Sequence, residues 1–148
     1  MKKKGFLISL LLAGLMLAAC ATQAEEAVVE EVVAEPVLTL SGAAEASWTA
    51  DDLNAMTMVD AEYTNKDGET TTYTGVSILD LLAAAGVSDY TTVSLVASDD
   101  YSADVAAEEL AACPTCIIAF DDDGTLRSVL PDFSSKAQVK DLVEIVIQ

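Results

Sequence analysis

Three cysteines are the side chains of this 148-residue chain best suited to chemistry. Cys113 and Cys116 form a Cys-Pro-Thr-Cys pair, and Cys20 lies far from them in the sequence. The pair is open to three interpretations: a local disulfide, a redox-active dithiol, or two ligands of a metal site. Redox-active pairs begin a helix, where the helix dipole stabilises the thiolate. Here the pair follows an expected helix over 106–112, whose negative end disfavours a thiolate, so a disulfide is the favoured interpretation.

The chain has no histidine, and this excludes several kinds of site. There can be no histidine general base, no Ser-His-Asp or Cys-His nucleophile, and no histidine metal ligand. A metal at Cys113 and Cys116 would need two more ligands, and the chain has no second C-x-x-C pair. The run Asp121–Gly124 lacks the alternating acids of a calcium loop, so it predicts a solvated hairpin turn. We therefore expect no metal site.

The charge balance excludes one class of partner. The chain carries 25 acids and 7 bases, a formal net charge of −18 at pH 7. A protein this acidic repels a phosphate backbone, so we expect no binding to nucleic acid.

The N-terminus has the order of a secretory signal peptide. Three lysines follow Met1, an apolar run extends from Phe6 to Met16, and small residues precede Cys20. The apolar run is too short to span a bilayer. The ending Leu-Ala-Ala-Cys resembles the lipobox of bacterial lipoproteins. That resemblance implies that residues 1–19 are removed and that Cys20 receives a diacylglyceryl group. The protein is then expected in the cell envelope, lipid-anchored on the extracytoplasmic face of a bacterial membrane.

Residues 20–36 are expected to form the lipidated cysteine and an acidic tether. Beyond the cysteine this segment consists largely of Ala, Val and Glu, and like charges four or five residues apart disfavour a helix. Removal of the first 19 residues would leave four bases against 25 acids, a net charge of −21. We therefore expect a solvated spacer that holds the domain away from the membrane surface.

Residues 37–148 predict one small α+β domain with a mostly antiparallel sheet. About seven short strands and two or three short helices are expected. Thr49 is a candidate N-cap, and Ser77 is expected to cap a helix that ends before Gly86. An Asp-Gly turn should join strands 56–64 and 69–74 into a hairpin. A final strand over 142–147 should place Val143, Ile145 and Ile147 on one face.

The segment 73–87 resembles the oxidoreductase molybdopterin-binding domain of the sulfite oxidase family. It reads Tyr-Thr-Gly-Val-Ser-Ile-Leu-Asp-Leu-Leu and then, three residues on, Ala-Gly-Val. Later matches follow in the family's order, among them Leu126–Pro131 and Val139-Lys140. The resemblance covers 37–148 and implies a sulfite-oxidase-like fold in a shortened form.

The departures from the family concern its cofactor. In catalytic members a cysteine before the Gly-Val run binds molybdenum, and histidine and several arginines hold the pterin and its phosphate. The corresponding segment Met58–Thr74 has no cysteine, and Arg127 is the single arginine. Arg127 and Lys140 remain as weak cofactor-binding candidates. We expect no bound cofactor and no catalytic molybdenum, with molybdopterin implied by the resemblance alone.

Three functions follow from this sequence. The favoured one is a binding or accessory role for the anchored domain, with a small ligand or a protein partner. The second is a molybdopterin-dependent oxidoreductase or its accessory subunit. The third is a thiol-redox protein that acts through Cys113 and Cys116.

Overall fold

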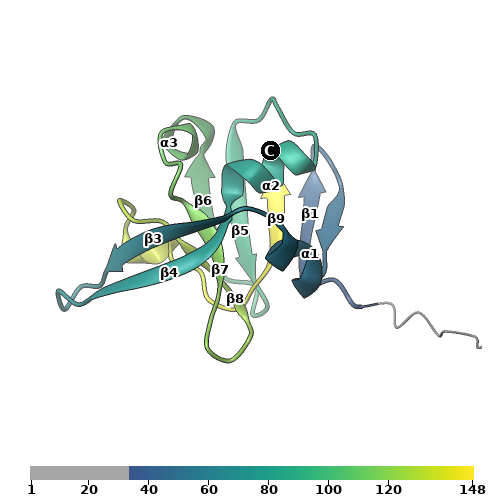
Figure 1. Ribbon diagram of the computed structural model, residues 1–148. Coiled ribbons are helices and arrows are strands. Elements are labelled where there is room, and N and C mark those ends of the chain that lie inside the picture. Colours follow the sequence, from purple (N-terminus) through teal and green to yellow (C-terminus); the bar gives the residue numbers. More distant parts are fainter. Residues whose placement is uncertain (1–33) are drawn as a thin grey trace, which may run out of the picture. The chain divides into compact units, whose positions relative to one another are not determined.

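The computed structural model describes residues 34–148, which form two sheets (Figure 1). The signal peptide, Cys20 and most of the tether lie outside the described residues. The five-stranded sheet has the order β2-β1-β9-β5-β6. Its strands are β1 (Leu38–Gly42), β2 (Ala46–Trp48), β5 (Thr92–Ala97), β6 (Ser102–Ala106) and β9 (Leu142–Ile147). Only the pair of β1 with β9 is parallel in the part of the chain that is described.

The four-stranded sheet has the order β3-β4-β7-β8 and is antiparallel throughout. Its strands are β3 (Met58–Thr64), β4 (Thr70–Ser77), β7 (Ile117–Phe120) and β8 (Leu126–Val129). The expected hairpin is confirmed: β3 pairs with β4 from Met58↔Val76 to Thr64↔Thr70, and its turn reaches out past the other strands (Figure 1). The expected α+β class is confirmed, although the strands form two sheets and β2 was not predicted.

Three short α-helices and one 3-10 helix complete the described residues. They are α1 (Ala50–Ala55), α2 (Ile78–Ala84), α3 (Ala107–Ala111) and η1 (Ser135–Ala137). Ser77 occupies the N-cap position of α2, but the expected cap is wrong because its side chain makes no capping hydrogen bond. Instead the backbone N–H of Ile78 donates to the carbonyl oxygen of Cys116 at 2.9 Å. None of the helices in 34–148 has the length and apolar character to cross a membrane.

The main hydrophobic core draws on both sheets and on all three α-helices. Its fully buried side chains include Leu38, Leu53, Val76, Ile78, Leu81, Leu95, Leu110, Leu130, Leu142 and Ile145. A smaller second cluster lies on one face of the four-stranded sheet and contains Ala61, Ile117, Ala119 and Val129, with Tyr63 and Tyr73 packed against it. This second face also carries the candidate site.

The final strand corrects one prediction. Val143 was expected to share a buried face with Ile145 and Ile147, but 41% of its surface is exposed. The pairing of β9 with β5 explains the difference, because the register shifts between Val96 and Ala97. That shift leaves one extra residue on β9, a β-bulge, which breaks the alternation of buried and exposed side chains.

Thr49 begins α1 with a capping box, as the sequence predicted. The Thr49 Oγ1 accepts from the Asp52 backbone N–H at 3.2 Å, and the Asp52 carboxylate accepts from the Thr49 N–H at 2.9 Å. The backbone and side-chain hydrogen bonds from Thr49 lower the pKa of Asp52.

A Thr49→Ala variant is expected to melt about 4 °C lower at neutral pH, because it loses the N-cap. The pKa of Asp52 is lower in the folded protein than in the unfolded chain. The stability that its carboxylate adds is therefore fully present above the unfolded carboxyl pKa of about 4, and it is lost as the pH falls through the folded pKa. The melting-temperature gap between wild type and variant should therefore narrow at pH 2. A gap of equal size at pH 7 and pH 2 would contradict the role of the Asp52 carboxylate.

Candidate functional site

Arg127 is the buried cation of this domain and the centre of the candidate site. It lies on β8 and is only 7% exposed. Across the sheet it pairs with Ala119 of β7, which pairs in turn with Gly75 of β4. Both partners are small, so the long side chain has room to cross β7 and reach Tyr73 on β4. A large side chain at either position would fill that space.

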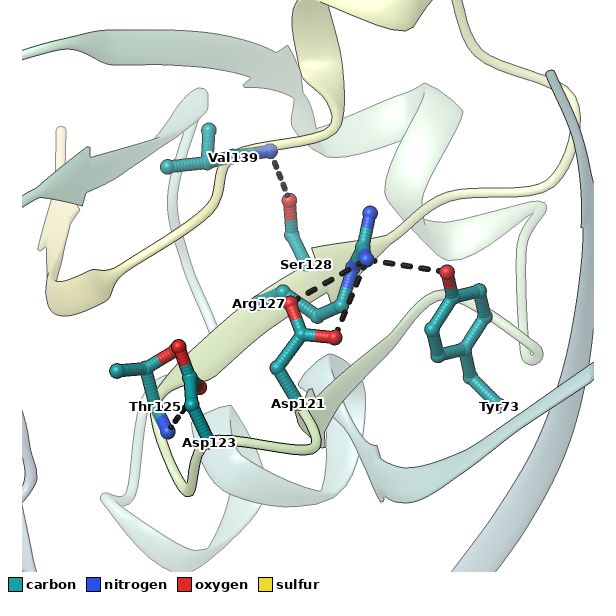
Figure 2. A network of polar contacts seen from close by, with 7 residues as sticks. All are labelled: Tyr73, Asp121, Asp123, Thr125, Arg127, Ser128 and Val139. Carbon is teal, nitrogen blue, oxygen red and sulfur yellow. Dashed lines mark hydrogen bonds and ion pairs between the residues drawn. The ribbon is translucent and has the colours of Figure 1, made fainter. Parts of the chain in front are cut away.

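Two neighbours hold one end of the guanidinium. Its Cζ lies 4.5 Å from the centroid of the Tyr73 ring, a cation–π distance. Its Nη1 donates to the Tyr73 hydroxyl at 3.0 Å and to the Asp121 carboxylate at 3.3 and 3.4 Å. Figure 2 shows dashed lines from one nitrogen of Arg127 to both Tyr73 and Asp121. Arg127 therefore has a fixed orientation.

The other edge of the guanidinium has no partner among residues 34–148. Nε is buried and unbonded, and the hydrogen bonds of this side chain all leave from Nη1. In Figure 2 one terminal nitrogen of Arg127 projects away from both neighbours without a dashed line. The Nε–H and Nη2–H of an arginine point in the same direction and match two oxygens of an anion. A buried donor without an acceptor is costly. Because Nε is closed to solvent, a ligand in the cleft would meet this edge at Nη2.

Arg127 lines a polar cleft of about 300 Å³. Its walls come from the β3–β4 hairpin, from β8 and from the segment that contains η1. The lining residues are Tyr63, Asn65, Glu69, Thr71, Tyr73, Arg127, Ser135, Gln138 and Lys140. The cleft has the size and the polar lining of a small-ligand site.

Buried hydrogen bonds place Lys140 in this cleft. The Ser128 hydroxyl, on the far face of β8, accepts from the Val139 N–H at 2.8 Å (Figure 2). It also donates to the Ala137 carbonyl oxygen at 2.9 Å. Gln138 adds two bonds to the backbone of Leu130. These contacts hold the segment beside β8, so that Lys140 forms an isolated bridge with Arg127. The two weak candidates of the sequence are thus brought together.

Two of the four bases of residues 34–148 line this cleft, namely Arg127 and Lys140. Lys66 and Lys136 are not lining residues. On a chain with 25 acids, this is the surface at which an anion meets the least repulsion.

The acidic run 121–124 forms a turn between β7 and β8, but its first residue has a partner that the sequence did not reveal. Asp122 and Asp123 are exposed, whereas the Asp121 side chain is 28% exposed and faces Arg127. Asp123 accepts from the side chain and backbone of Thr125 at 2.7 and 3.0 Å, and these bonds lower its pKa. Within the described residues no three His, Cys, Asp or Glu side chains group in a way that could hold a metal ion.

Cys113 and Cys116 form a disulfide, with a sulfur–sulfur distance of 2.06 Å. The pair follows α3 and precedes β7, as expected, and Cys116 is fully buried while Cys113 is 7% exposed. Neither lines the cleft. The bond closes the turn from which the Cys116 carbonyl accepts the first N–H of α2. The arrangement indicates a structural role.

A Cys113→Ala, Cys116→Ala variant is expected to lose about 2 kcal/mol of unfolding free energy, from the entropy of a short closed loop. Urea denaturation of the oxidised wild-type protein and the variant measures this loss. Anion binding in the cleft should be unchanged. A variant as stable as the wild-type protein would contradict the structural role of the disulfide. A folded variant that loses an activity of the wild-type protein would favour the thiol-redox alternative.

The sequence did not identify Tyr73 and Asp121 as site residues. Tyr73 was part of the motif 73–87, and Asp121 was part of a turn. They lie 54 and 6 residues from Arg127 and meet it through strand pairing. The available signal was that the single arginine lies two residues before Val129 on a short expected strand, so both share one face; an arginine that faces inward needs partners.

The comparisons with known proteins bear on the fold. No protein-family model matches the chain, and no curated protein matches it significantly. A similar solved structure is the crystal structure of the sulfane dehydrogenase SoxCD from Paracoccus pantotrophus, with a TM-score of 0.63 and 18% identity. The match covers 74% of this chain and 37% of that chain, so this chain spans little more than a third of the length of its neighbour. At this identity the likeness shows the fold alone, and that fold is sulfite-oxidase-like, as the segment 73–87 predicted.

Proposed function

We propose that this chain is an extracytoplasmic lipoprotein whose sulfite-oxidase-like domain binds a small anion in the cleft at Arg127. Its role is binding or accessory. The observation that carries the proposal is a buried arginine that lines a polar cleft and whose Nε and Nη2 make no hydrogen bond within residues 34–148. A buried, oriented guanidinium binds an anion with little further loss of side-chain entropy.

The donor set of the described residues supports binding rather than molybdenum catalysis. A thiolate ligand would have to come from Cys113 or Cys116, and these two sulfurs are bonded to each other. A pterin phosphate carries two negative charges, and in this cleft it would meet the carboxylates of Asp121 and Glu69. The groups that line the cleft therefore do not fit the cofactor of the family.

The N-terminal motif supports the location of this role. A diacylglyceryl group on Cys20 would tether the domain through residues 20–36. Two acyl chains anchor a protein stably, because each buried CH₂ contributes roughly 0.8 kcal/mol. The acidic tether and domain would stand away from anionic lipid, leaving the cleft open to solutes outside the membrane.

The test compares anion binding by wild-type protein and an Arg127→Lys variant in isothermal titration. Lysine keeps the positive charge but lacks the planar, fixed donors of a guanidinium. The affinity of the Arg127→Lys variant for acetate should therefore be lower than that of the wild type by about tenfold or more. A Lys66→Ala variant is the control, because Lys66 is exposed and pairs with Asp67 at 3.3 Å. It should bind as the wild type does.

Two results would overturn the proposal. Absence of binding by any small anion, or equal affinity of wild type and Arg127→Lys, would remove the cleft as an anion site. Stoichiometric molybdenum and pterin in protein purified from molybdate-fed cells would favour the alternative, a molybdopterin-dependent oxidoreductase or its accessory subunit.

A further inference from the structure

We infer that Asp121 makes the Arg127 cleft selective for monoanions over dianions such as sulfate or phosphate. The inference rests on the proposed anion-binding role and names the class of anion. It depends on which donors of Arg127 are free and on which charges line the cleft.

Asp121 already occupies one end of the guanidinium. Its two oxygens lie 3.3 and 3.4 Å from Nη1, and its side chain is partly buried beside the nearly buried arginine. Most of the positive charge of Arg127 is therefore neutralised before a ligand arrives. What remains is the Nε–Nη2 edge, whose accessible donor is Nη2 because Nε is closed to solvent.

The charges in and beside the cleft balance without a ligand. Arg127 and Lys140 line the cleft and are positive, whereas Glu69 on its wall and Asp121, which pairs with Arg127 but does not line the cleft, are negative. A monoanion adds one negative charge and meets the Nη2 donor and the Lys140 ammonium. The second charge of a dianion gains no additional lining base and repels both carboxylates.

Asp121 is thus the specificity-determining residue of the site. At the effective dielectric of a partly buried site, one unit charge several ångströms away changes affinity by about tenfold for each charge on the ligand. Removal of the Asp121 charge should therefore raise the affinity for a dianion about tenfold more than the affinity for a monoanion.

The single arginine of the chain supplies a direct probe of this site. In ¹⁵N-labelled full-length protein, the arginine side chain gives one Nε–H signal, which must belong to Arg127. We would follow this signal while titrating acetate, methyl sulfate and sulfate at pH 7.5 and low ionic strength. Methyl sulfate and sulfate share one oxyanion head and differ in charge, which isolates the effect of the second charge.

In the wild-type protein the signal should saturate with acetate and methyl sulfate at concentrations about tenfold below those needed for sulfate. In Asp121→Asn the preference for methyl sulfate over sulfate should fall about tenfold. Asp122→Asn is the matched control, because it removes one charge from the same turn at an exposed side chain. The preference of Asp122→Asn for methyl sulfate over sulfate should stay within about twofold of the wild-type preference, since distant exposed charges are screened.

The outcomes separate this inference from the proposed function. If no anion moves the Arg127 signal, the anion site itself is wrong. If all three anions move it and wild-type protein binds sulfate at least as tightly as methyl sulfate, only the selectivity is wrong. Equal loss of preference in Asp121→Asn and Asp122→Asn would overturn the role of Asp121. Should Asp121→Asn fail to fold, the wild-type order of methyl sulfate and sulfate still decides the inference.

Discussion

Gly75→Ala is expected to destabilise the domain by about 3 kcal/mol or more, because it overpacks a backbone contact. A Cβ on Gly75 would collide with the carbonyl oxygen of Ile118 and would lie 2.7 Å from the Cα of Ala119. Both are backbone atoms of the paired strand β7, so no side chain can move aside. The overlap can be relieved only if the strands β4 and β7 move apart. The urea midpoint of unfolding measures the loss.

The effect should extend to the candidate site. Gly75 pairs with Ala119, and Ala119 pairs with Arg127, so a shift of β7 moves the arginine relative to Tyr73. Anion affinity should fall in any Gly75→Ala protein that still folds. Gly68→Asn is the control: Gly68 has a φ of +84°, which asparagine tolerates, and no atom lies within 4 Å of its added Cβ. Equal stability of the two variants would contradict the packing argument.

Cys20→Ser is expected to abolish lipid attachment and thereby stable membrane association. The thioether to the diacylglyceryl group needs the cysteine sulfur, and a serine hydroxyl does not replace it in the lipobox. Intact-mass measurement of protein from the membrane fraction tests this directly. Wild-type protein should have the mass of a chain that begins at Cys20 plus lipid, and the variant should lack the lipid mass.

The remaining cysteines supply the control for that experiment. A Cys113→Ser, Cys116→Ser variant should keep the lipid mass and partition into detergent as the wild type does, because it changes only the disulfide. A Cys20→Ser protein that still carried the lipid mass would overturn the lipoprotein proposal. The anion-binding proposal would be unaffected.

Local elements could be predicted where the apolar residues recur with a single period along the sequence. The strand 142–147 has the predicted bounds, and the hairpin turn lies at the predicted Asp-Gly. Thr49 caps α1 as expected, since a cap depends only on residues within one turn. The predictions for Val143 and Ser77 were wrong because a bulge against β5 and a backbone acceptor on Cys116 override the local pattern.

The sequence by itself predicted the sulfite-oxidase-like fold class, a Cys113–Cys116 disulfide as the favoured of three interpretations, and the two basic candidates, Arg127 and Lys140. It also predicts the lipid anchor at Cys20, which the Cys20→Ser experiment will test. These inferences depend on residues close together in the chain or on motifs in a set order. Only the tertiary structure decided that Arg127 lies on Tyr73, bonds Asp121 and keeps one edge free. The physical reason is that these contacts cross three strands, and their geometry follows from pairing register and from the small residues Gly75 and Ala119 between them.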